Sequence, residues 1–381
     1  MNRSVHFLLG ISTLSSIYAQ ELIQDAKPES CKCFSTYDKI QDREILPSGQ
    51  LNINSCVSPF ISADYLMWYV NQEGLEYAFT GSSLNDVALS NNYVSRGNQF
   101  DPPGRLNSGF RVGFGLNTDY DNWEIGAYYT WIKTQSISVL PYVTSPIYQV
   151  PYAFSNNFLR SSSNGGDQSV NGGGRDYKLY FNAFDLLLSK RVFITPKILI
   201  QPVVGLKGGY QKSKTASSFV FTNAYFNKNN NTSSSNVSGS YLTNEVMHYG
   251  SVGPKIGLST IWKIARSVGF VADLGFSNVW SWYKTKRIDV IPEILSSTNT
   301  TLLTNFTVGD VIRTKKTLNQ IFETKLGFEF ETCFHKGAYK IKTGAFWEGQ
   351  IWMNQLQSAS PQLPNANLIL QGLTLDLRLD F

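Results

Sequence analysis

The sequence predicts an all-β protein, a transmembrane antiparallel up-and-down β-barrel of about ten strands. Three observations support this fold class. Apolar and polar residues alternate with a period of two from Ser58 onward, as in half-buried strands. Short and long connections alternate strictly between these segments, as in outer-membrane barrels. Charged residues make up only 16% of the chain while aromatic residues reach 14%, and aromatic girdles are typical of such barrels.

The clearest alternation is a long hairpin. Phe110, Val112, Phe114 and Leu116 share one face of its first strand, and glycines and Arg111 share the other. The same template fits ten segments in all: 58–70, 107–118, 122–133, 177–191, 197–210, 246–262, 269–284, 318–331, 339–352 and 367–381. Segment 177–191 is the least regular, so which of its side chains face inward is uncertain from sequence.

The connections between these segments fall into two classes. Four are short, and five are long: 71–106, 134–176, 211–245, 285–317 and 353–366. Short periplasmic turns, long extracellular loops and an even number of strands are the pattern of bacterial outer-membrane barrels. Within the loops, 138–152 and 217–225 form either strand extensions or small hairpins, and hairpins would raise the count to twelve or fourteen. The Asn- and Ser-rich run 228–240 is too polar to fold alone.

A soluble β-sandwich is the competing explanation of many strands. Its strands usually have about 5–6 residues, whereas these segments run near the length that a tilted strand needs to cross a bilayer. Every Trp also lies near a segment end, as expected for belts of aromatic rings at two membrane interfaces: Trp68, Trp123, Trp131, Trp262, Trp280, Trp282, Trp347 and Trp352. We therefore expect lipid to cover the apolar face from Phe60 to the end of the chain.

The N-terminus has the pattern of a secretory signal peptide. Arg3 precedes an apolar stretch that ends near Ile17, with Ala19 at the expected cleavage site. An anchor helix is the alternative, but the stretch is too short to span a bilayer. We expect a signal peptide at 1–19, a periplasmic cysteine-containing segment at 20–57 and the barrel at 58–381.

The residue types that carry enzymatic or metal chemistry are scarce. Only His248 and His335 remain after the signal, and no cysteine spacing matches a zinc site. We expect no metal, no cofactor, no nucleic-acid partner and no enzymatic activity. A barrel enzyme that pairs His248 with a serine and an acid is a third, less favoured alternative.

Charges on the inner face are the functional candidates. Besides Asp64, Glu329 and Glu348, strand parity assigns eleven residues to the lining of a pore: Arg111, Glu124, Lys207, Lys255, Asp273, Glu323, Lys325, Lys340, Lys342, Asp376 and Arg378. Mixed charges in a water-filled lumen would bias ion selectivity. They would equally well pair with one another and plug a barrel of this narrow diameter. We expect Arg313, Lys315 and Lys316 to meet anionic lipid headgroups.

The cysteines are expected on one side of the membrane. Cys31 and Cys33 belong to the N-terminal segment, Cys56 precedes the first strand and Cys333 ends the eighth. The periplasm is oxidising, so two hypotheses stay open: bridges within the chain or to a periplasmic partner, and free thiols.

Several segments together resemble the Legionella-type major outer membrane protein family. They are the run from Phe60 to Trp68, Gly74 to Ala78, Gly109 to Gly115, Trp123 to Trp131, Gln201 to Leu206, Gly250 to Leu258 and Gly372 to Phe381. The resemblance implies a pore-forming protein and transfers no catalytic residues. Related porins carry cysteine crosslinks. The terminal Phe381 on an amphipathic strand resembles the signal that the barrel-assembly machinery reads.

These observations predict a porin-like channel of the bacterial outer membrane for passive diffusion of small hydrophilic solutes or ions. The alternative is a non-conducting barrel that anchors surface loops for adhesion or ligand binding. The expected partners are outer-membrane lipid and the barrel-assembly machinery, and the oligomeric state stays open.

Overall fold

The computed structural model describes residues 57–80, 98–118, 122–144, 148–150, 159–160, 168–228, 232–265, 267–334, 339–359 and 365–381. The signal peptide and the N-terminal segment expected up to residue 56 lie outside these residues. Among the residues described, no helix is long and apolar enough to cross a membrane.

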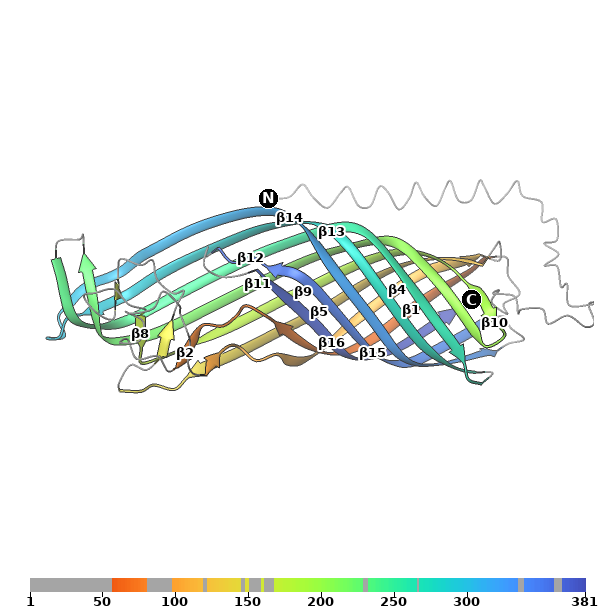
Figure 1. Ribbon diagram of the computed structural model, residues 1–381, viewed down its shortest axis with the longest axis horizontal. Helices are drawn as coiled ribbons and strands as arrows, with labels where there is room; N and C mark the ends of the chain where they lie inside the picture. Colours follow the sequence, from red (N-terminus) through yellow and green to blue (C-terminus); the bar gives the residue numbers. More distant parts are fainter. Residues whose placement is uncertain are drawn as a thin grey trace, which may run out of the picture. The chain divides into compact units, whose positions relative to one another are not determined.

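Ten long strands dominate the described part of the chain (Figure 1). They are β1 (Val57–Gln72), β4 (Arg105–Thr118), β5 (Trp123–Leu140), β9 (Gly172–Lys190), β11 (Ile198–Lys228), β12 (Thr232–Lys263), β13 (Val268–Leu295), β14 (Thr301–Phe334), β15 (Tyr339–Leu356) and β16 (Ala366–Asp380). Short strands accompany them: β2 (Ala78–Thr80), β3 (Gln99–Phe100), β6 (Tyr148–Val150), β7 (Leu159–Arg160), β8 (Gln168–Val170) and β10 (Val192–Thr195).

The ten long strands close into a ring in which all neighbours are antiparallel. Each pairs with the next along the chain, β9 pairs with β11, and β1 closes the ring against β16. The register of this closure runs from Phe60 opposite Asp380 to Gln72 opposite Leu368. The predicted antiparallel barrel, including its ten principal strands, is confirmed.

Glycines on the inner face make room for large inward side chains. A Cβ at Gly113 would lie 2.4 Å from the Tyr128 ring, and one at Gly115 would lie 2.5 Å from the Phe60 ring. The inner face of β4 therefore needs residues without a side chain, because narrow barrels are filled by large side chains from their own strands.

The inner face is layered, and β13 displays the order. Starting at the end with short turns, its inward residues are Val271 in an apolar cluster, Asp273 in a charged layer, Val279 and Tyr283 in a second apolar cluster, and Ile291 in a third. The second cluster is the largest. It takes residues from β1, β5, β9, β12, β13, β14, β15 and β16.

Strands β11 to β14 continue far beyond the other strands at the end with long loops, as Figure 1 shows. This extension has its own core, which includes Tyr77, Phe219, Phe221, Tyr241 and Ile291. The prediction that 211–245 and 285–317 are loops is therefore wrong for most of their length. Segments 138–140 and 217–225 are strand extensions. Polar segment 232–240 is ordered by its pairing with β11, which single-segment composition does not reveal.

The outer face carries an apolar belt over roughly 250–262 of β12, 270–282 of β13 and 318–330 of β14, with exposed Ile256, Leu274 and Leu326. We call this the apolar belt. Trp262, Trp280, Trp282 and Trp347 are 46–58% exposed on this face. Trp68 and Trp352 are 0% and 1% exposed because they face inward, so assigning them to lipid belts was wrong. Phe60, 1% exposed, also faces inward.

Candidate functional site

A layer of charged side chains lines the lumen within the membrane-spanning part of the barrel. Every one of the ten long strands supplies at least one member: Asp64, Arg111, Glu124, Asp185, Lys207, Lys255, Asp273, Glu323, Glu348 and Asp376. Alternation along a strand positions them, because every second residue points to the same face. The sequence-predicted residues Lys325, Lys340, Lys342 and Arg378 also lie inside the barrel.

One group in this layer is a four-membered ring of two lysines and two carboxylates. Lys207 contacts Asp185 at 3.0 Å and Glu323 at 2.8 Å, while Lys255 contacts Asp185 at 3.0 Å and Glu323 at 2.5 Å. The Lys207 side chain is 1% exposed. The alternation of signs around the ring satisfies a buried ammonium group that would otherwise be strongly unfavourable in this position.

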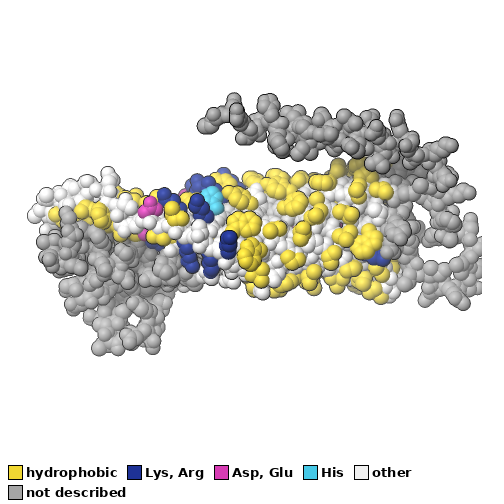
Figure 2. Space-filling view, turned by 90° about the horizontal axis from the view of Figure 1, so that it is seen from above, with side chains coloured by type: hydrophobic (Ala, Val, Ile, Leu, Met, Phe, Trp, Pro, Cys, Tyr) yellow, Lys and Arg dark blue, Asp and Glu magenta, His cyan; other side chains and the backbone are white. Residues whose placement is uncertain are grey.

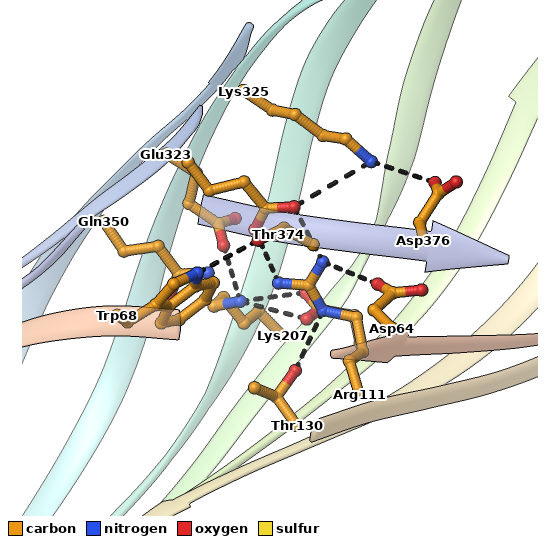
Figure 3. Close-up of polar contacts among 12 residues, drawn as sticks. Asp64, Trp68, Arg111, Thr130, Lys207, Glu323, Lys325, Gln350, Thr374 and Asp376 are labelled. Atoms are coloured by element: carbon orange, nitrogen blue, oxygen red, sulfur yellow. Dashed lines mark hydrogen bonds and ion pairs between the residues drawn. The ribbon is translucent and has the colours of Figure 1, made fainter. Parts of the chain in front are cut away.

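A second group is centred on Arg111 (Figure 3). The Arg111 guanidinium donates to both oxygens of Glu348 at 3.1 and 2.8 Å, to Asp64 at 3.1 Å and to Thr130 at 3.1 Å. Lys325 lies 3.8 Å from Glu348 and 3.5 Å from Asp376. Six strands, β1, β4, β5, β14, β15 and β16, are thus held together by one arginine and one lysine. Two-point pairing of this kind suits the planar fork of arginine.

Two further groups lie toward the end with short turns. Arg378 contacts Glu124 at 2.9 Å and Asp380 at 2.7 Å, and Arg191 also pairs with Glu124. Glu331 is shared by Lys263 and Lys340, the latter at 2.7 Å. The charges in the lumen therefore pair extensively with one another, which is the plugged arrangement and not an open ring of like charges.

The sequence missed several members of this layer. Asp185 and Arg191 lie in segment 177–191, whose parity was ambiguous because Leu186, Leu187 and Leu188 are consecutive. Lys263 and Asp380 lie at strand ends, where alternation gives the weakest signal.

Aromatic rings cover the charged layer on the side of the long loops. Arg111 lies 5.6 Å from the Trp68 ring centroid and Lys207 lies 5.5 Å from that of Trp352. The indole N–H of Trp68 donates to Thr374 at 3.0 Å, and that of Trp352 donates to Gln350 at 3.1 Å. Figure 3 shows Trp68 with its hydrogen bond to Thr374. Both rings thus use their apolar faces for packing and their N–H groups for anchoring.

The lumen is packed at this level. Leu66, Ile132, Phe181, Val279 and Ile321, from five different strands, are each 0% exposed. Below them, a cavity of about 300 Å³ remains inside the charged layer, lined by residues such as Asp64, Lys255, Asp273 and Lys342. The structure therefore contains a cavity lined in part by charged side chains beneath a thick apolar plug. We call this plug the aromatic plug and define it by the cluster that contains Trp68, Phe181, Tyr249 and Trp352.

Residues in the first half of the fifth predicted loop extend the plug outward, where Arg313 and Lys315 from the end of the fourth predicted loop contact them. Arg313 donates to the Ser358 carbonyl at 2.7 Å, and Lys315 donates to Gln357 at 2.8 Å. Both side chains face inward, so the expectation that they meet lipid headgroups was wrong. Of the three residues expected at the headgroups, Arg313, Lys315 and Lys316, strand parity places only Lys316 on the outer face. Segment 353–359 enters the lumen, because Gln355 and Gln357 are 0% and 1% exposed.

The other predicted sites are only partly within reach. Cys31, Cys33 and Cys56 lie outside the described residues, and Cys333 is a free, exposed thiol at the end of β14. His248 faces outward, with Nδ1 3.2 Å from the Tyr210 hydroxyl oxygen. Among the described residues, no cluster of three His, Cys, Asp or Glu side chains is arranged to hold a metal ion. Phe381 donates its N–H to the Pro59 carbonyl at 3.0 Å.

Comparison with known families decides the classification. Residues 61–381 match the family of the Legionella pneumophila major outer membrane protein precursor. The chain belongs to this family. The predicted family resemblance is confirmed, and so is the location in the bacterial outer membrane. The end with long loops is accordingly extracellular and the end with short turns is periplasmic.

Several solved outer-membrane proteins align with the chain at low similarity. The outer membrane protease OmpT from Escherichia coli aligns with a TM-score of 0.38 and 11% identity, over 85% of this chain and 96% of that one. The toluene transporter TodX from P. putida aligns with a TM-score of 0.26 and 8% identity, over 87% of this chain and 91% of that one. A search among curated proteins finds no match.

Proposed function

We propose that this protein is an outer-membrane anchor that presents a rigid β-extension at the cell surface. The observation that carries the proposal is the combination of a packed lumen with an extracellular extension that has its own core. The first property opposes passage of solutes, and the second suits display of a defined surface.

The extension is built to keep its shape. β11 and β12 pair continuously from Ile198 opposite Trp262 to Phe221 opposite Gly239. Arg175 donates to the carbonyl oxygens of Leu75 and Glu76 at 2.9 and 3.2 Å, which ties the first loop to the wall. Polar groups satisfied in this way favour one conformation over many. A stable surface is what recognition of an external partner requires.

The lumen supports the same conclusion. Barrels of about eight strands have an interior just wide enough for side chains, whereas porins that leave an aqueous channel have 16–18 strands. A ten-stranded ring is close to the first case. The aromatic plug and the paired charges beneath it fill its interior.

Passive diffusion of small hydrophilic solutes or ions is the second candidate. The cavity of about 300 Å³ in the charged layer favours it. Conduction would then require the aromatic plug to move aside, with the charged layer beneath it acting as the selectivity element. We propose no enzymatic role in either case.

Single-channel recording separates the two candidates. Purified, refolded protein is inserted into planar bilayers, with a known porin as the positive control and with Trp352→Ala as a variant that thins the plug. We expect silent bilayers for the wild type and for the variant, because Trp68, Phe181 and Tyr249 still fill the lumen. Stepwise currents from the wild type would overturn the anchor proposal and favour the channel. Currents from Trp352→Ala alone would identify the plug as a gate.

A further inference from the structure

A band of cationic side chains borders the apolar belt on its extracellular side. Figure 2 shows Lys and Arg side chains gathered where the hydrophobic side chains end. By strand parity, the outward members are Lys133, Lys178, Lys212, Lys214, Lys284, Lys286 and Lys316. We call these seven residues the basic belt. They lie on β5, β9, β11, β13 and β14, within a run of six neighbouring strands completed by β12. At about 4.8 Å between strands, the run is roughly 24 Å wide.

Strand register places all of these residues but Lys316 in two rows. In the first row, Lys212 is opposite His248 and His248 is opposite Lys284. Lys133 joins the first row through Tyr180, which is also opposite Lys212. Lys316 is opposite Trp282, below the first row. In the second row, Lys214 is opposite Lys178, and Lys286 follows two strands further on through Val246. The rows are therefore fixed by backbone pairing and do not depend on the rotamers of long side chains.

Aromatic residues lie directly beneath the rows. Tyr210 and Trp282 are each two residues below a lysine of the first row, and they are 54% and 46% exposed. Aromatic side chains of this kind lie at the membrane–water interface. Two residues along a strand span about 6.6 Å, so the lysines lie at the level of lipid headgroups.

The basic belt has little compensation from the protein itself. Lys178 pairs with Asp176 at 3.0 Å, and Lys286 lies 3.9 Å from Asp310. Within the described residues, Lys212, Lys214, Lys284 and Lys316 have no acidic partner within 4.0 Å. Like charges placed opposite each other on neighbouring strands are destabilising. An external anion would remove this repulsion.

The positive charge of the belt lysines also affects His248. It lies above the apolar belt, where burial and the nearby Lys212 and Lys284 lower its pKa below the usual range. The positive charge of the belt at neutral pH therefore belongs to its lysines.

We propose that the basic belt binds the phosphate groups of lipopolysaccharide, the phosphorylated glycolipid of the outer leaflet. Two rows of lysines match a ligand that carries more than one phosphate on a rigid sugar core. The apolar belt below would contact its acyl chains. Each juxtamembrane lysine adds to the free energy of binding to an anionic lipid surface. The basic belt therefore orients the barrel in the membrane and holds the lipid next to β11 to β13. The proposal concerns a lipid site on the outer face and holds whether or not the lumen conducts.

The test measures lipopolysaccharide binding by full-length refolded protein in detergent. The variant Lys212→Gln/Lys284→Gln neutralises the first row. The matched control, Lys190→Gln/Lys197→Gln, removes two lysines at the periplasmic end. At roughly fivefold per lysine, we expect binding about 25-fold weaker for the first variant and unchanged for the control. Heat-modifiable migration in electrophoresis verifies that each variant is folded.

Three ligands identify the source of the phosphate. Intact lipopolysaccharide is expected to bind the wild type, while enzymatically dephosphorylated lipopolysaccharide and phosphatidylglycerol are expected to bind at least tenfold more weakly. Equal binding of the dephosphorylated glycolipid would overturn the proposal, because phosphate would not be recognised. Equal binding of phosphatidylglycerol would also overturn it, because the belt would then be a general anionic-lipid surface. If a variant fails to fold, the three ligand measurements on the wild-type protein alone still test the proposal.

Discussion

Arg111 on β4 donates two hydrogen bonds, of 3.1 and 2.8 Å, across the lumen to Glu348 on β15. These residues are far apart in sequence, and their strands are not neighbours in the ring, because β1 and β16 lie between them. The pair therefore braces the barrel across its interior, a contact that strand pairing alone does not provide.

Removing one member of this pair leaves a buried charge without its partner. Arg111→Met is expected to lower the free energy of unfolding by about 3–5 kcal/mol. The double variant Arg111→Met/Glu348→Gln should lose less than the sum of the single variants. Urea denaturation of the four proteins in lipid vesicles, analysed as a double-mutant cycle, gives the coupling. A coupling near zero would contradict the brace.

The apolar belt predicts that an arginine on the outer face of β14 destabilises the protein only where lipid covers the strand. Leu326 is 51% exposed within the belt and Ile312 is 60% exposed on the same outer face beyond it. Leu326→Arg is expected to cost about 2–4 kcal/mol of unfolding free energy, because the charge enters the hydrocarbon region. Ile312→Arg, the matched control, should change stability little. Similar losses from both variants would show that lipid does not cover Leu326.

The C-terminal residue is hydrogen-bonded to the beginning of β1. The Ser58 hydroxyl donates to the Phe381 carbonyl at 3.2 Å, next to the contact between Phe381 N–H and Pro59. Deleting Phe381 should lower the amount of heat-modifiable protein in the outer membrane. Phe381→Tyr keeps an aromatic terminus and should assemble normally. Normal assembly of the deletion variant would argue against a role of Phe381 as an assembly signal.

Glu245 gives the extension a pH-dependent stability. It lies beyond the basic belt and accepts a hydrogen bond from the Ser358 hydroxyl at 2.9 Å. Burial raises the pKa of its carboxyl above the ordinary value of 4.5. The folded state therefore binds this proton more tightly than the unfolded state, and the group adds stability as pH falls through the raised pKa.

The matched variant is Glu245→Gln, which keeps the acceptor but not the charge. It should be more stable than the wild type at pH 7, with the difference shrinking as pH falls toward 4.5. Chemical denaturation across this pH range measures the difference. A variant that is less stable at pH 7 would refute the assignment.

Sequence patterns predict much of this molecule because lipid imposes a strict alternation on strands. The ten strands and their antiparallel order follow from that alternation, and so does the inward placement of residues such as Arg111 and Lys207. The prediction for Trp68 and Trp352 was wrong because it used their nearness to a strand end, which suits the lipid interface and a packed lumen equally well. Trp68 has the strand parity of Asp64 and Trp352 that of Glu348, so alternation along the strand would have placed both inward.

The extension and the pairing within the lumen were also beyond local patterns. Segment 232–240 has the composition of a loop, yet β12 includes it because β11 pairs with it along its length. Asp185 was missed because three consecutive leucines conceal the parity of its strand. Whether charges in the lumen pair or repel depends on which strands face each other across the ring, which single segments do not encode.

The most direct test of the account measures the surroundings of β14 residue by residue. Single spin labels at 319, 321, 322 and 326, with the four cysteines of the chain replaced by serine, are exposed to oxygen and to a water-soluble nickel complex in vesicles. We predict high oxygen collision rates at 322 and 326, where lipid lies, and low rates for both reagents at 319 and 321, where the aromatic plug lies. High accessibility of 319 and 321 to the nickel complex would mean a water-filled lumen and would contradict the account.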